Sequence, residues 1–286
     1  MFLAIGCVVV LVCVFGGYLA SGGHFDVLIQ PFEFLIIGGA AIGAFITSNP
    51  MTVIKGVGKG IGAAAKGSPF KKADYLELLS MLFAIFKLAK SKGNLALEQH
   101  IENPEESALF QQFPGVAKNH HAVEFICDYL RLVTLGTENV HEMEALIDSE
   151  LETHHNEQHQ IAAAVQAMAD GTPALGIVAA VLGVIHTMGA ITEPPAVLGH
   201  LIGGALVGTF MGVLLAYGFI GPIASAMTAS FAAEAKYLEC IKAGLLAHIA
   251  GHPPAVSVEF ARKALLSDVR PDFKELEEAT GKVLPV

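Results

Sequence analysis

Four long stretches without a charged residue dominate this chain, covering 1–21, 34–54, 171–192 and 194–233. A helix needs about 20 consecutive apolar residues to cross the hydrocarbon core of a bilayer. The fourth stretch is longer than one crossing, so we expect it to leave the membrane near Pro222 and to continue as a helix. The predicted transmembrane helices are therefore 1–21, 34–54, 171–192 and 199–224.

The basic residues give these spans a direction. All seventeen Lys and Arg residues lie within 55–131 and 236–282. Basic residues mark cytoplasmic loops, so 22–33 and 193–198, which contain none, are predicted to be periplasmic. The 55–170 loop and the 225–286 tail are then cytoplasmic, as are both termini. The first span lacks the basic leader of a cleaved signal, so we expect it to be retained as a helix.

Composition excludes several classes of function. The formal net charge is −10, and binding to nucleic-acid phosphates needs a basic face. We find no catalytic triad, P-loop or other nucleotide motif, so we expect neither an enzyme nor a bound cofactor. The four cysteines lack the spacing of a zinc site or a disulfide framework, so we expect reduced thiols.

The polar segments show helical periodicity and no strand-like alternation of any length. The predicted class is therefore all-α, with the loop and the tail packed together as a helical cytoplasmic domain. The expected cytoplasmic helices are 74–92, 119–135, 138–168, 225–250 and a last one near 256–266. A further short helix is expected just after the second span. Its lysines, Lys55, Lys59 and Lys66, would lie on lipid headgroups, although a solvated basic linker stays open.

The middles of the predicted spans contain no Asp, Glu, Lys or Arg. A proton path normally needs an ionisable group inside the membrane. His186, near the outer end of the third span, is interpreted as an interfacial histidine. If this chain conducts protons, another chain must supply the carboxylate.

Small residues recur every four positions at Gly204, Gly208 and Gly212, and again at Gly39 and Gly43. This spacing lets helices approach closely in lipid, so it predicts tight helix association.

Two prolines lie near the cytoplasmic ends of the last two spans. Pro173 fits the first turn of a helix with Thr172 as its N-cap, whereas Pro222 lies inside a helical run and should kink it. His154, His155 and His159 cluster further upstream. His155 and His159 are one turn apart, but no third ligand is spaced to complete a site, so a solvated face is favoured and no metal is assigned.

Several long motifs resemble the MotA family of flagellar stator subunits, within the MotA/TolQ/ExbB proton channel superfamily. DGTPALGIVAAVLGVIHTMG at 170–189 and LGHLIGGALVGTFMGVLLAYGFIGP at 198–222 are similar to its third and fourth membrane segments. LALEQHIENPEES, FICDYLRLV, MEALIDSELETH and VEFARKALLSDVRPDFKELEE match in the same order. The resemblance covers nearly the whole chain.

The resemblance implies a function and partners. Five such subunits surround two MotB-type subunits, each with one membrane helix that carries the ion-binding aspartate, and each anchored to peptidoglycan. Proton passage turns the ring of A subunits, whose cytoplasmic domain pushes the rotor protein FliG and so drives swimming and chemotaxis from the inner membrane. No cofactor is implied beyond the translocated H⁺.

The resemblance also assigns roles to single residues. It places rotor contacts at Glu98 and Lys90, coupling at Pro173 and Pro222, and the lining of the ion path at Thr209 and Ala180. Lys87 or Lys92 are alternatives to Lys90, because the best-known members have Arg at the basic position. Sodium-type members carry Thr where this chain has Ala180, and Na⁺ needs several oxygen ligands, so protons are favoured.

Three alternatives stay open. A sodium-driven stator would share the fold. An energy-transducing subunit of the ExbB/TolQ type usually has three spans, so the hairpin formed by the first two spans argues against it. A scaffold or small-solute channel would need no single-span partner.

Overall fold

The computed structural model describes residues 2–67, 70–137 and 139–284, and within them it contains helices and no strand. This confirms the all-α class. The chain forms two compact units. Unit 1 comprises Met1–Gly67 with Glu157–Phe231, and unit 2 comprises Ser68–Asn156 with Ala232–Val286. Some residues of the predicted segments lie outside the described ranges, among them Met1 of the 1–21 span, Glu138, and Pro285 and Val286 at the end of the tail.

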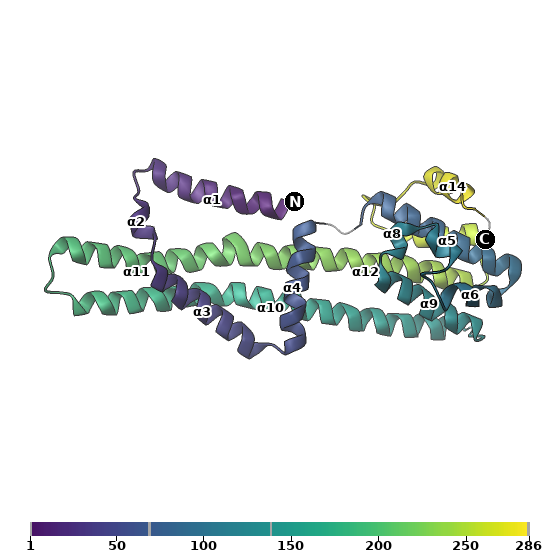
Figure 1. Cartoon of the computed structure of the whole chain (residues 1–286), viewed down its shortest axis with the longest axis horizontal. Coiled ribbons are helices and arrows are strands. Elements are labelled where there is room, and N and C mark those ends of the chain that lie inside the picture. Colours follow the sequence, from purple (N-terminus) through teal and green to yellow (C-terminus); the bar gives the residue numbers. More distant parts are fainter. Residues whose placement is uncertain (1, 68–69, 138, 285–286) are drawn as a thin grey trace. The chain divides into compact units, whose positions relative to one another are not determined.

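Unit 1 holds the apolar helices, whose α-helical members are labelled in Figure 1. They are α1 (Phe2–Ala20), α2 (Phe25–Leu28), α3 (Pro31–Ser48), α4 (Met51–Lys66), part of α10 (Val140–Gly189), α11 (Pro195–Leu215), the π-helical η2 (Ala216–Ile220) and the first part of α12 (Gly221–Ile249). Four helical segments are long and apolar enough to cross a membrane, as the sequence predicted.

The largest differences between the helix ends and the predicted span limits are at the end of the second span and the start of the fourth. The second span was expected to run to Ile54, but α3 ends at Ser48 because Asn49 precedes Pro50 and adopts an extended backbone. The last span was expected to start at Gly199, but α11 starts at Pro195, since a proline fits the first turn of a helix.

Helix α4 packs through small residues. A β-carbon on Gly56 would lie 2.6 Å from Ile161 Cδ1, and one on Gly60 would lie 2.6 Å from Met227 Cε. The glycines allow the close approach that a larger side chain would prevent. The three lysines of α4 are exposed.

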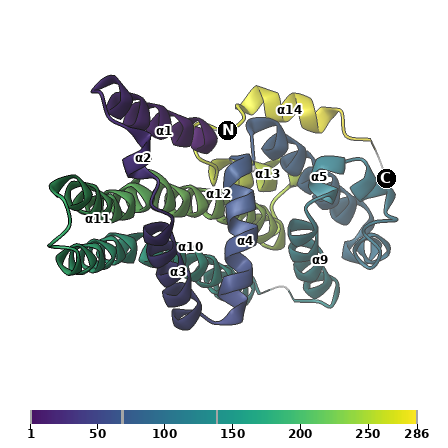
Figure 2. The same ribbon diagram turned by 60° about the vertical axis from the view of Figure 1, so that its left-hand side comes forward.

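Unit 2 is built around α5 (Lys72–Lys92), which buries side chains on almost every face. Figure 2 shows it beside α13 (Pro254–Lys263) and α14 (Phe273–Gly281), which it contacts. The other elements of the unit are η1 (Asn94–Leu97), α6 (Glu98–Ile101), α7 (Ala108–Gln111), α8 (Pro114–Ala117), α9 (His120–Thr134), the start of α10 and the end of α12.

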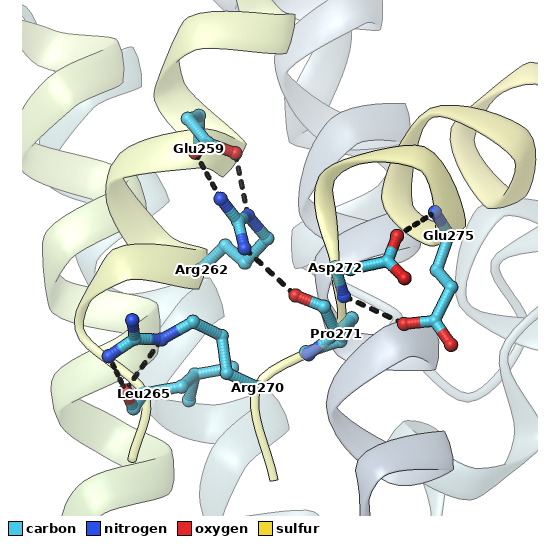
Figure 3. A network of polar contacts seen from close by, with 7 residues as sticks. All are labelled: Glu259, Arg262, Leu265, Arg270, Pro271, Asp272 and Glu275. Carbon is cyan, nitrogen blue, oxygen red and sulfur yellow. Dashed lines mark hydrogen bonds and ion pairs between the residues drawn. The ribbon is translucent and has the colours of Figure 1, made fainter. Parts of the chain in front are cut away.

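Helix α14 was not expected from the sequence. It is short, and its start is set by a capping box in which the Asp272 side chain accepts from Glu275 N and Glu275 accepts from Asp272 N. The pattern Asp-x-x-Glu after Pro271 was the available signal. Figure 3 shows this cap beside a buried arginine.

That arginine, Arg262, holds the tail together. Its side chain is only 8% exposed, and it donates to both carboxylate oxygens of Glu259, at 2.7 and 2.5 Å. Its Nη1 donates to the Pro271 carbonyl at 2.8 Å. The hydrogen bonds from Arg262 hold the pKa of Glu259 below its ordinary value near 4.5. The two-point pair orients the segment that leads into α14.

We expect Glu259→Ala to destabilise unit 2 by about 1–3 kcal/mol, because it leaves a nearly buried guanidinium with too few acceptors. The depressed pKa means that the contribution of Glu259 is present at neutral pH and is lost as the pH falls below about 4.5. Thermal unfolding can be followed by labelling of Cys240, whose buried thiol donates to Ala261 O in α13. A Cys7→Ala, Cys13→Ala background removes the thiols of α1.

The matched control is Glu278→Ala, which removes an exposed carboxylate from α14. It should leave the unfolding midpoint unchanged. Equal midpoints for the two variants would show that the Arg262 pair contributes nothing to stability.

Candidate functional site

The centre of unit 1 is the contact between α10 and α11, which lie side by side in Figures 1 and 2. A β-carbon on Gly212 would lie 2.8 Å from Gly176 Cα, and one on Gly208 would lie 3.0 Å from Ala179 Cβ. A β-carbon on Gly176 would in turn lie 2.8 Å from Gly208 O. The two backbones therefore touch, as small residues allow in lipid.

The other small-residue positions behave differently. Gly204 faces the side chain of Gln30, with a distance of 3.0 Å between its built β-carbon and Gln30 Nε2. Gly39 and Gly43 have no atom within 4 Å of a built β-carbon. Within this chain, close helix contact therefore involves the glycines of α11 and not those of α3.

One of the two residues assigned to the ion path, Ala180, lies at this contact. Ala180 is next to Gly208, whose built β-carbon would lie 3.1 Å from Ala180 N, and Thr209 follows Gly208 on α11. Both are half-buried. Thr172 and Thr187 bond back to their own helix, at 2.6 and 2.9 Å. In the part of the chain described, no such bond involves the Thr209 hydroxyl.

Pro173 is not at a helix start, contrary to expectation. It lies inside the continuous helix α10, and Thr172 is not an N-cap, because its hydroxyl donates to Met168 O within the helix. A proline inside a helix removes one backbone hydrogen bond. The long polar part of α10 before Pro173 continues as helix through this residue, so the Thr-Pro pair does not start a new helix.

Pro222 follows a widened turn of the helix. The backbone is π-helical over Ala216–Ile220, and the Gly221 N–H donates to Ala216 O five residues back. Because Pro222 has no N–H, it cannot bond to Gly218 O in the ordinary α-helical pattern. A single π-helical turn is a common site of distortion and is frequent at functional sites.

The charged candidate residues lie on unit 2. Lys90 is exposed in the last turn of α5, and Glu98 is exposed at the start of α6. The chain turns between them at Gly93. Its φ of +85° would strain any residue with a side chain. Within the described ranges, no salt bridge joins either charge to another side chain. Both are therefore available to an outside partner.

The alternatives to Lys90 are also exposed. Lys87 Nζ lies 5.9 Å from the centre of the Phe83 ring. Lys92 contributes to lowering the pKa of buried His100, after the larger effect of burial, and Lys90 does the same for His248. Nearby lysines thus lower the pKa of one buried and one half-buried histidine.

His200 is a second ionisable group of the apolar helices, beside His186, and was not expected there from the sequence. It is exposed in the second turn of α11, and His186 is exposed near the end of α10. Neither position is in the middle of its helix. The described spans also have no Asp or Glu near their middles, as the sequence indicated.

Comparison with known proteins decides the family. Residues 4–93 match the model of the motility protein A N-terminal region, and 118–240 match that of the MotA/TolQ/ExbB proton channel family. Motility protein A of Salmonella typhimurium is 45% identical over 97% of this chain and 94% of its own length. The chain belongs to the motility protein A family. Chemotaxis protein LafT of Vibrio parahaemolyticus is 38% identical, covering 96% of each chain.

The fold agrees with this membership. The chain matches the flagellar MotAB stator complex from Bacillus subtilis with a TM-score of 0.75 and 25% identity, covering 96% of this chain and 98% of that one. The MotAB structure from C. jejuni gives a TM-score of 0.77 over 93% of this chain. This MotA-family chain is therefore a homologue of the flagellar stator subunit and a multi-pass membrane protein.

Proposed function

We propose that this chain is the proton-driven, torque-generating A subunit of a bacterial flagellar stator. The observation that carries the proposal is the α10–α11 contact, where Ala180 lies against Gly208, the residue before the half-buried Thr209, in a membrane unit that has no central carboxylate. Proton movement through such a site requires an acid from a second protein. A MotB-type single-span, peptidoglycan-binding subunit fits that requirement.

The exposed apolar surface supports an assembly in the membrane. Helix α1 buries none of its residues within this chain, and Val8 and Val12 are more than half exposed. Such a surface must face lipid or neighbouring helices. A ring of five copies around two MotB-type chains, in the inner membrane with both termini in the cytoplasm, uses these faces. The basic loop and tail support that orientation.

The apolar side chain of Ala180 supports protons as the coupling ion. A sodium ion gives up hydration only when several oxygen ligands replace the water, and Ala180 offers no side-chain oxygen. A proton needs only a carboxylate and a path.

Deletion of the gene tests the proposal. The deletion strain should build flagella that do not turn, and re-expression should restore swimming in sodium-free medium. Restoration only with sodium would favour the sodium-driven alternative. Normal swimming after deletion of this and any duplicate gene would favour an ExbB/TolQ-like role or a channel without a partner.

The rotor contact is tested by reversing one charge. We expect Glu98→Lys to lower swimming speed several-fold while membrane insertion stays normal, because Glu98 is exposed and makes no salt bridge in the described chain. Surface charges steer and align partners more than they stabilise a fold, and the rotor protein FliG is the proposed partner. Speed is measured by tracking cells and insertion by membrane fractionation.

The matched control is Glu152→Lys, an exposed carboxylate on α10 in the same unit. It should swim at the parental speed. A loss of membrane insertion in Glu98→Lys would instead assign Glu98 to folding and contradict the rotor role. Lys90→Glu compared with Lys87→Glu and Lys92→Glu then identifies the basic contact by its larger loss of speed.

A further inference from the structure

Unit 2 brings together two histidines and a glutamate that are far apart in the sequence. His121 lies in α9, His154 in α10 and Glu234 in α12, and one donor atom from each lies within 4.8 Å of the others. His121 Nδ1 is 3.7 Å from Glu234 Oε1, and the rings of His121 and His154 are 4.6 Å apart between centroids. His155 and His159, the pair singled out by spacing, are exposed and are not part of this group.

The scaffold around these donors is already fixed by other contacts. Tyr129 donates to Glu150, which ties α9 to α10. Lys242 Nζ lies 2.5 Å from Asp148 Oδ1, which ties α10 to α12, and this lysine is only 18% exposed. Three donors on cross-linked helices are pre-organised, which lowers the cost of assembling a ligand set.

The donor set selects a class of cation. Two imidazoles and one carboxylate are the ligands that zinc accepts in three-ligand sites, with a fourth position left for water. Magnesium and calcium prefer oxygen ligands throughout, so they fit poorly. The side chains of His121 and Glu234 are 39% and 34% exposed, so a cation can reach them from solvent.

We propose that His121, His154 and Glu234 form a binding site for a divalent transition-metal cation of the zinc type. Ligand atoms that share a tetrahedral zinc ion lie about 3.4 Å apart, as bond lengths of about 2.0–2.1 Å require. The His121–Glu234 distance already approaches this value. Because all separations are within 4.8 Å, none must shorten by more than about 1.4 Å, which side-chain rotation supplies without moving the helices.

Bound metal would cross-link three helices of unit 2. Helix α9 starts at His120 and is held there by the Asn119 side chain, which accepts from Ala122 N at 3.2 Å. A cation on His121 would add a second restraint on this end of α9. Binding to the folded chain alone raises its thermal stability with metal concentration.

The test is direct metal binding by the full-length chain in detergent, carrying an affinity tag without histidine and freed of metal with a chelator. Zn²⁺ alone is titrated by calorimetry, and Co²⁺ is titrated by its visible absorption, which reports the geometry of nitrogen and oxygen ligands. We expect one saturable site per chain in the parent. His154→Ala and Glu234→Gln should each weaken binding by at least about tenfold.

The matched control is His155→Ala, which removes the neighbouring histidine on the same helix and should bind like the parent. Glu234→Gln keeps the size of the side chain, so its effect remains readable if His154→Ala fails to fold. Absence of a saturable site in the parent, or equal affinity in the parent and in Glu234→Gln, would overturn the proposal.

Discussion

Pro222→Ala is expected to leave the protein in the membrane at a normal level and to abolish swimming. Alanine restores an N–H at this position, so Gly218 O regains an α-helical partner and the π-helical turn at Ala216–Ile220 can close. The helix gains about 0.5–1.5 kcal/mol from the added bond, so folding does not suffer. The proposed coupling does suffer, because it uses the distorted turn as the place where the helix bends.

The control for Pro222→Ala is Pro195→Ala. Pro195 occupies the first turn of α11, where the N–H of any residue lacks a helical acceptor. Its replacement should leave swimming near the parental level. Membrane fractions and single-cell tracking measure both variants, and normal swimming by Pro222→Ala would contradict a role for this proline in coupling.

Gly212→Ala is expected to cause a large loss of folded protein. The added β-carbon would lie 2.8 Å from Gly176 Cα and 3.1 Å from Thr172 O, which are backbone atoms of α10. No side-chain rotation relieves such a contact, so α10 and α11 must separate. Overpacking of this kind costs about 1–3 kcal/mol, and separation also removes neighbouring contacts along the pair.

Gly199→Ala provides the comparison within the same helix, because a β-carbon there meets no atom within 4 Å. It should behave like the parent. The readouts are the amount of inserted protein and its thermal unfolding midpoint in detergent. An unchanged midpoint for Gly212→Ala would show that the two helices are not held at this distance in the membrane.

Helices and their class follow directly from local pattern. The uncharged stretches are long enough for spans, and the basic residues predict which loops are cytoplasmic, because water and lipid differ so strongly as surroundings for charge. The expected helix at 119–135 corresponds to α9, with Asn119 as its N-cap. The motifs pointed to the correct family, since they are long and occur in a fixed order.

Local signals were misleading where two helices merge or where an element is short. Thr172 and Pro173 resemble a helix start, yet α10 runs through them because the helical residues on both sides continue the hydrogen-bonded ladder. Helix α14 was missed because it is short and has few apolar residues, so it shows little helical periodicity. Its capping box was the only strong local signal.

The sequence by itself determined the membrane class, the helical fold, the family and the absence of Asp, Glu, Lys and Arg from the middles of the spans. These depend on composition, on spacing along one helix and on contiguous motifs. Only the tertiary structure decided which glycines touch, that His154 meets His121 and Glu234, and that Pro222 follows a π-helical turn. The first two features depend on atoms that come together from separate helices, and the third depends on a changed hydrogen-bond pattern within one helix. The spacing of residues along the chain encodes neither kind of feature.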